Sequence, residues 1–138
     1  MSPELQDKLI KQFPELFNDR DAKTPFNAWG FEFDDGWYNL TVELLTELSQ
    51  YIAKNKGKDF CILQQKEKYS VLRCYISGIE KDEDFKAIRE IISRYEKKSS
   101  ETCEICGKPG GTLKKGYWLK TLCPEDAAKL GYLESIYV

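Results

Sequence analysis

The sequence predicts an α+β fold in which helices pack on a small antiparallel β-hairpin sheet, followed by a C-terminal metal-binding module. Apolar residues recur at spacings of three and four in segments 37–52 and 85–95, as in amphipathic helices. Between them, segments 60–65 and 71–77 have the composition of two strands around a turn. Three closely placed cysteines after residue 100 point to the metal-binding module.

The N-terminal third predicts one helix, a connection and a short extended segment. A helix is expected to begin at Pro3, because Ser2 is a suitable cap and proline favours the first helical position. Pro14 limits this helix. Residues 18–27 are polar and are expected to form a connection. Aromatic residues alternate with glycine and glutamate over residues 29–33, which predicts a short strand or an extended arm.

The two long helices of the body have recognisable ends. Residues 34–36 are expected to form a turn and a cap before the first of them, and Gly57 stands where a helix end favours glycine. Asp82 is expected to cap the second helix. The buried stripe of that helix is predicted to consist of Phe85, Ile88, Ile92 and Tyr95.

Composition excludes several classes of protein. The net charge of -2 gives no strong attraction to nucleic acid or to an anionic membrane. No stretch reaches the ~20 apolar residues of a membrane span, and the first residues lack the apolar core of a signal peptide. With no export signal, an odd number of cysteines favours the reducing cytoplasm and metal ligation over disulfides. The absence of histidine removes the commonest general base, so no catalytic residue is assigned.

The cysteines form two half-sites of the kind that hold structural zinc. These are Cys103-Glu104-Ile105-Cys106 and Cys123-Pro124-Glu125-Asp126. A knuckle, a hairpin around Gly116 and a helix carrying the second half-site follow the order of a treble-clef zinc finger. A segment of about 35 residues cannot bury enough apolar surface to fold alone, so a metal would supply the missing stability.

The sequence therefore predicts a structural Zn²⁺ site with the ligands Cys103, Cys106, Cys123 and Asp126. A competing interpretation is that Asp126 is only an acidic residue favoured near a helix N-terminus. Residues 1–100 are expected to form the α+β body, and residues 101–138 a zinc-binding module packed on it as one compact unit.

Several motifs occur together: Trp29-Gly30-Phe31-Glu32, Asp35-Gly36-Trp37-Tyr38, Gln65-Lys66-Glu67-Lys68-Tyr69 with Leu72-Arg73 and Tyr75, Cys103-Glu104-Ile105-Cys106-Gly107-Lys108-Pro109-Gly110, and Trp118-Leu119-Lys120-Thr121-Leu122-Cys123. In this combination the chain resembles a family of small proteins encoded in phage and prophage genomes. That family usually has histidine where this chain has Asp126, and it tends to have cysteines where Ala28 and Phe33 stand. The resemblance implies a protein made inside a bacterial host cell, which fits a host-factor binder or an inhibitor of host defence.

A candidate binding surface combines aromatic and basic residues, namely Trp29, Trp37, Lys66, Lys68, Arg73, Tyr75, Lys114, Lys115 and Trp118. The first hypothesis is stoichiometric binding of a bacterial host protein. The second is nucleic-acid binding, because segment 86–120 has nine Lys or Arg against four Asp or Glu. The third is a nucleotide-type ligand held by Trp29, Trp37, Arg73 and Tyr75. Homo-oligomer contact through the apolar C-terminal residues is a further possibility.

Two smaller groups of residues have mainly structural interpretations. Glu32, Asp34 and Asp35 form a carboxylate cluster that is compatible with acid/base chemistry, but a helix cap with an acidic loop is the simpler interpretation. Cys61 and Cys74 fall on the two predicted strands and are expected to be buried free thiols.

Overall fold

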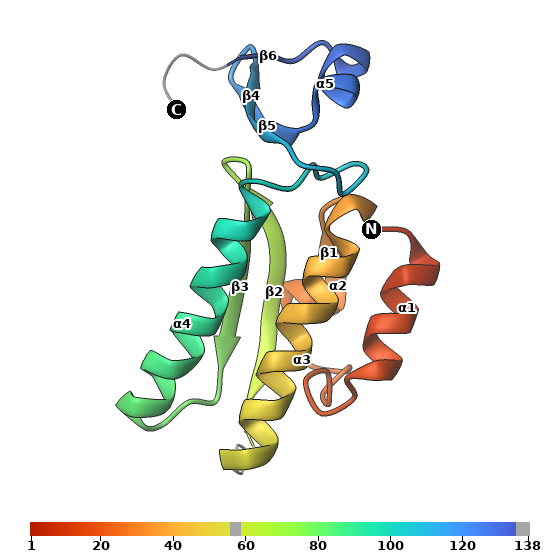
Figure 1. The fold of residues 1–138 in the computed structure, drawn as a ribbon. Helices are drawn as coiled ribbons and strands as arrows, with labels where there is room; N and C mark the ends of the chain where they lie inside the picture. The colour runs from red at the N-terminus through yellow and green to blue at the C-terminus, as the bar shows by residue number, and fades with distance from the viewer. Residues whose placement is uncertain (56–58, 135–138) are drawn as a thin grey trace.

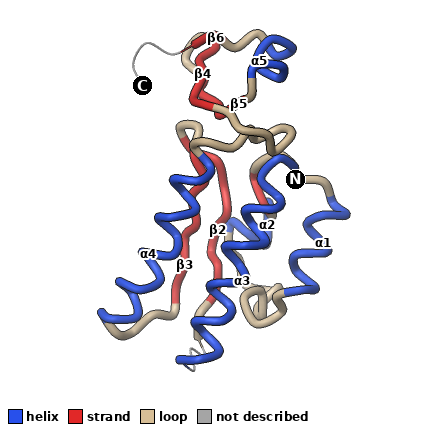
Figure 2. The backbone as a smooth tube through the Cα atoms, in the orientation of Figure 1, coloured by secondary structure: helices blue, strands red, loops and turns tan. Residues whose placement is uncertain are grey.

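A computed structural model describes residues 1–55 and 59–134. Helices α3 and α4 lie side by side against a three-stranded sheet, α1 lies beside α3, and a small unit with its own sheet stands on one end of these layers (Figures 1 and 2). The elements are α1 (Pro3–Gln12), α2 (Pro25–Trp29), β1 (Phe31–Glu32), the 3-10 turn η1 (Asp35–Trp37), α3 (Tyr38–Asn55), β2 (Cys61–Lys68), β3 (Val71–Ser77), α4 (Asp82–Ser99), β4 (Gly111–Lys115), β5 (Trp118–Leu122), α5 (Pro124–Leu130) and β6 (Leu133–Glu134). The predicted α+β class is confirmed.

The main sheet has the order β1-β2-β3. β2 and β3 form the predicted antiparallel hairpin, with a register irregularity between Ile62 and Gln64. The extended segment after Trp29 becomes β1, which pairs with β2 in parallel, Phe31 lying opposite Gln65. The sheet is therefore mixed, and not purely a hairpin.

The prediction that residues 18–27 form a connection is wrong for its last residues, which lie in a helix. Pro25 starts the short helix α2, and the Asn27 N–H donates to the Thr24 side chain at 3.1 Å. A capping hydroxyl followed by proline at the first helical position is a local start signal, and it outweighs the polar composition of the stretch. α2 places Phe26 in the core, stacked on Phe17 with ring centroids 4.7 Å apart.

The second long helix differs from its prediction in two details. Lys81 occupies the cap position without a side-chain hydrogen bond, and Asp82 is the first helical residue. Phe85 is 52% exposed, because burial along α4 begins only at Ile88, one turn later. Ile91 is buried in addition to the predicted residues. Gly57 lies outside the described residues, as do residues 135–138. None of the described helices is long and apolar enough to cross a membrane.

Glu47 connects the two long helices and gives the fold a pH dependence. The Glu47 carboxylate of α3 lies 2.6 Å from Arg94 of α4 and also accepts a hydrogen bond from the Tyr95 hydroxyl. The hydrogen bond from Arg94, followed by that from Tyr95, lowers the pKa of Glu47 below its usual 4.5. The stability that this contact contributes is therefore fully present above pH 4.5, and it is lost as the pH falls through the lowered pKa of Glu47 in the folded protein.

We expect Glu47→Gln to lower the free energy of unfolding at neutral pH by about 1 kcal/mol or less, because the pair is partly exposed. The difference from the wild type should vanish in acid, where the carboxylate is protonated in both the folded and the unfolded state. Urea unfolding at neutral pH and in acid measures this difference in the free energy of unfolding. Glu90→Gln, an exposed carboxylate on α4, is the control; an equal pH effect there would contradict the assignment.

Candidate metal centre

The C-terminal module, residues 101–134, is built around a knuckle, a small sheet and a short helix. In the knuckle, Cys103 donates its backbone N–H to Lys108 at 2.7 Å, and Gly107 donates back to the Cys103 carbonyl at 2.9 Å. Gly107 has a φ of 80°, a conformation that favours glycine. β4 pairs with both β5 and β6, so the second sheet has the order β5-β4-β6.

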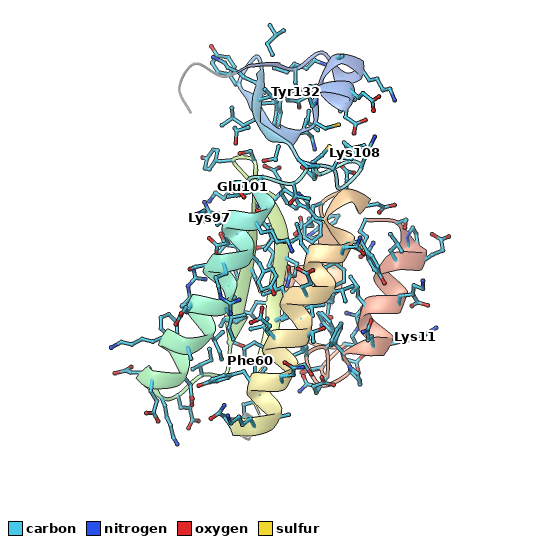
Figure 3. The ribbon with its side chains drawn as sticks, viewed as in Figure 1. Lys11, Phe60, Lys97, Glu101, Lys108 and Tyr132 are labelled. Atoms are coloured by element: carbon cyan, nitrogen blue, oxygen red, sulfur yellow. The ribbon has the colours of Figure 1, made fainter. Side chains whose placement is uncertain are left out.

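The second half-site lies at the start of α5. Cys123 is its cap residue, Pro124 opens the helix, and the Asp126 N–H points at the Cys123 sulfur at 3.4 Å. Gly131 ends the helix in the left-handed conformation. Tyr132 then packs against the small core of the module, where Figure 3 labels it.

These two half-sites bring four ligand atoms together. The sulfurs of Cys103, Cys106 and Cys123 and a carboxylate oxygen of Asp126 all lie within 4.8 Å of one another. Asp126 Oδ2 is 3.3 Å from the Cys103 sulfur and 3.2 Å from the Cys123 sulfur. The Cys106 and Cys123 sulfurs are 3.6 Å apart. The four residues are therefore close enough to hold a metal ion.

Burial and hydrogen bonding set the electrostatics of this group. Cys103 and Cys123 are buried, Asp126 is 9% exposed, and Cys106 is exposed. Hydrogen bonds from Cys106, Cys123 and Cys103 lower the pKa of Asp126. The Lys108 backbone N–H lowers the pKa of Cys106, but hydrogen bonding to Asp126, desolvation and the other two sulfurs outweigh it and raise that pKa to about 12. A metal would displace protons from the thiols, so its affinity should rise with pH.

The knuckle is attached to the body through residues 34–37. The Gly36 N–H donates to the Glu104 carbonyl at 2.8 Å, and the Asp34 N–H donates to the Glu104 carboxylate at 3.1 Å. Trp37, which is fully buried, donates its indole N–H to the Thr102 carbonyl at 2.8 Å. Figure 3 labels Glu101 and Lys108 at this junction. The candidate ligands are therefore held against the start of α3.

Glu104 lies between two of the ligands and is only 2% exposed. Burial raises its pKa, while Lys120, whose Nζ lies 3.2 Å from the carboxylate, acts against this shift. Sequence reasoning did not identify Glu104 or Lys120, because a charged residue between two ligands is normally exposed. No local pattern marks this long-range contact.

A second contact joins the module to the turn of the β2–β3 hairpin. The Thr121 hydroxyl donates to the Ser70 carbonyl at 2.7 Å, and the Ser70 and Thr112 hydroxyls are 3.1 Å apart. Ser70 is only 3% exposed. The module is thus attached to the body at two points, one at residues 34–37 and one at this turn.

The candidate binding residues do not form one surface. Trp37 is buried in the core, so the prediction that it lies on a binding surface is wrong. The predicted ligand pocket formed by Trp37 with Trp29, Arg73 and Tyr75 is wrong for the same reason. Trp29 is 71% exposed at the end of α2. The others lie on the β2–β3 hairpin (Lys66, Lys68, Arg73, Tyr75) and on the small sheet of the module (Lys114, Lys115, Trp118).

The structure separates the carboxylate cluster. Glu32 accepts from the Gln64 side chain, Asp34 lies 3.4 Å from Lys120, and Asp35 accepts from the Ser2 N–H. Each acid thus has a structural partner of its own.

The two thiols of the hairpin also lie apart in the register. Cys61 lies opposite Ser77, while Cys74 lies opposite Gln65. Cys74 is buried as expected, and burial raises its pKa to about 12. Cys61 is only partly buried.

Comparisons of the chain with protein-family models, with curated proteins and with solved structures found no match.

Proposed function

We propose that Cys103, Cys106, Cys123 and Asp126 hold a structural Zn²⁺ ion in a treble-clef-like module. With Zn–S bonds of about 2.3 Å and Zn–O bonds of about 2.1 Å, a tetrahedral site has S···S edges of about 3.8 Å and S···O edges of about 3.6 Å. In the structure the Cys106 and Cys123 sulfurs are 3.6 Å apart, close to the S···S edge, and the S···O separations of 3.3 Å and 3.2 Å are slightly shorter than the S···O edge. A donor set with three thiolates favours zinc over the hard cations.

The small core of the module supports a structural role for this ion. Its buried members are Cys103, Leu122, Cys123 and Ala127. Two of these four are proposed ligands, so little apolar side chain remains to stabilise the module. A metal would tie the knuckle to α5 and supply this stability.

The role of Asp126 can be tested by substitution. Asp126→Ala should weaken zinc retention against a chelator because one ligand is lost, by about 10-fold or more. Asp126→His should retain zinc more strongly than the wild type, because imidazole is a better zinc ligand than carboxylate. Zinc content during titration with a chromogenic chelator measures both effects. The matched control is Glu125→Ala, an exposed acid in the same helical turn. Equal retention in the Asp126→Ala and Glu125→Ala variants would remove Asp126 from the ligand set.

We infer that the protein acts by binding another protein, as a phage-encoded accessory factor that binds and inhibits a bacterial host protein. The phage setting rests on the motif resemblance described above. Binding is supported by the hairpin of the module, where Tyr117 is fully exposed and Trp118 is 75% exposed. Tyrosine and tryptophan are the residues that most often dominate the energy of protein interfaces. A hairpin held in place by a metal would present them without a large loss of conformational entropy on binding.

A comparative pull-down from bacterial lysate tests this proposal. The wild type should retain one stoichiometric host protein at moderate salt, and the double variant Tyr117→Ser/Trp118→Ser should lose it while keeping its zinc and its melting temperature. Trp29→Ser is the matched control, because Trp29 is equally exposed but lies on the body. Retention by the double variant, or loss by the control, would contradict a role for the hairpin. Light scattering of the purified protein shows whether the hairpin instead mediates self-association.

A further inference from the structure

A cavity of about 270 Å³ lies where the β2–β3 turn and the β3 strand approach α4. Its lining residues are Lys68, Tyr69, Arg73, Cys74, Tyr75, Arg89 and Glu96. Lys68 ends β2 and Tyr69 lies in the hairpin turn. Arg73 and Tyr75 come from β3, and Arg89 and Glu96 lie on the same face of α4, two turns apart. This cavity is separate from the proposed metal site and from the hairpin of the module.

The charge of the cavity is positive. Lys68, Arg73 and Arg89 line the cavity together with a single carboxylate, that of Glu96, which leaves an excess of two positive charges in a chain whose net charge is -2. Glu96 lies 3.1 Å from Arg73 and 3.2 Å from Arg89, and its side chain is only 16% exposed. One carboxylate therefore fixes two guanidinium groups, each of which has five N–H donors. Most of those donors remain for an anion.

Two tyrosines complete the cavity. Tyr75 is 42% exposed and Tyr69 is 71% exposed. Tyr69 has a φ of 50° and Ser70 a φ of 74°, conformations that cost energy for residues other than glycine. The turn is nevertheless held, because Ser70 donates its N–H to Glu67 and accepts from Thr121. Positive φ at both central residues is the geometry of a two-residue type I′ turn, which fits the pairing of Lys68 with Val71 on either side of it. The turn places the exposed Tyr69 ring beside Lys68.

We propose that this cavity binds a small phosphate monoester with a planar ring, of the nucleoside monophosphate class. Arg73 and Arg89 bind the phosphate oxygens, because a guanidinium matches phosphate geometry in a bidentate manner. Lys68 adds a third charge, and a tyrosine ring packs against the planar group of the ligand. A volume of about 270 Å³ falls slightly below the usual range for ligand pockets, which suits one nucleotide and not a longer ligand.

A purely structural interpretation explains only part of the cavity. The contacts of Glu96 with Arg73 and Arg89 would connect β3 to α4 even without a ligand. They do not involve Lys68, whose Nζ lies 5.7 Å from the Tyr69 ring centroid, and they do not place a ring at the cavity. The substitutions below separate the two interpretations.

Calorimetric titration of the intact protein with adenosine monophosphate is the test. Arg73→Gln and Arg89→Gln should each weaken binding at least 10-fold, because each removes a charged phosphate contact. Lys68→Ala should weaken it several-fold and leaves both Arg–Glu contacts in place. Lys97→Ala is the matched control, an exposed lysine of α4 outside the cavity lining, and it should bind like the wild type. No binding of the nucleotide at millimolar concentration, or equal weakening by the two lysine variants, would overturn the proposal.

Further probes distinguish the parts of the ligand. Ribose 5-phosphate should bind more weakly than adenosine monophosphate, and adenosine should not bind measurably. A single-stranded oligonucleotide that binds with steep salt dependence while the mononucleotide does not would overturn the proposal in favour of a nucleic-acid surface. Binding of inorganic phosphate with the same affinity as the nucleotide would overturn the part assigned to the tyrosines.

Tyr69→Asn separates binding from stability. Asparagine tolerates the left-handed conformation of this position, so the melting temperature should rise by a few degrees. Nucleotide affinity should fall several-fold, because the exposed ring is lost. Unchanged affinity in this more stable variant would remove Tyr69 from the site.

Discussion

Cys103→Ser is expected to abolish zinc retention and to unfold the C-terminal module. Cys103 is fully buried, and its sulfur is central to both the proposed metal site and the small core of residues 101–134. Structural zinc contributes roughly 10–16 kcal/mol of folding free energy in isolated zinc-finger peptides, so a loss of about 5 kcal/mol or more is expected here. The body should also be weakened, because residues 102–104 bond to residues 34–37.

Tryptophan fluorescence and metal analysis measure this effect together. Trp37 is buried and bonded to Thr102, whereas Trp29 and Trp118 are largely exposed. Loss of the module should therefore shift the emission of Trp37 to longer wavelength. A chelator should cause the same shift in the wild type and no further shift in Cys103→Ser. The control is Cys61→Ser, a partly buried thiol on β2. A variant that lost zinc but kept its melting temperature would contradict a structural role for the metal.

Gly36→Ala is expected to detach the module from the body. A Cβ atom at position 36 would lie 2.3 Å from the Cys103 carbonyl oxygen and 2.5 Å from the Glu104 carbonyl carbon. These are backbone atoms of the knuckle that carries two of the candidate ligands, so they can move aside only if the knuckle moves. We expect a loss of about 3 kcal/mol, the upper end of the usual cost of overpacking. Zinc should also dissociate faster, because Cys103 is displaced.

Gly111→Ala provides the matched control for this substitution. Gly111 lies in β4, and a Cβ atom there would meet nothing within 4 Å. Thermal unfolding and the rate of zinc transfer to a chelator should both change for Gly36→Ala and stay close to wild type for Gly111→Ala. Equal melting temperatures for the two variants would show that the knuckle is not seated on Gly36.

The parts of this fold that follow local patterns could be predicted from the sequence. The spacing of Leu44 and Leu48 indicated α3, and the spacing of the cysteines indicated which residues converge. α2 escaped prediction because its start signal, Thr24 before Pro25, lies in a stretch that is otherwise polar. The helix-start signal and the polar composition favour different structures for this stretch, and the packing of Phe26 on Phe17 favours the helix.

The contacts that place the candidate site could not be predicted in this way. Trp37 was expected at a binding surface, but it is fully buried in the core, and its indole N–H donates to the Thr102 carbonyl, sixty-five residues away in the sequence. Glu104 and Ser70 are likewise buried by partners far along the chain, Asp34 and Thr121. No periodicity marks such contacts, since they arise only when two separately folded parts meet.

The hairpin turn at Tyr69 and Ser70 contacts both the proposed nucleotide cavity and the C-terminal module. Tyr69 lines the cavity proposed to bind a nucleotide, and Ser70 is hydrogen-bonded to Thr112 and Thr121 of the C-terminal module. By thermodynamic reciprocity, a ligand that orders this turn would raise the affinity of the module for its metal by the same factor by which the metal raises the affinity for the ligand.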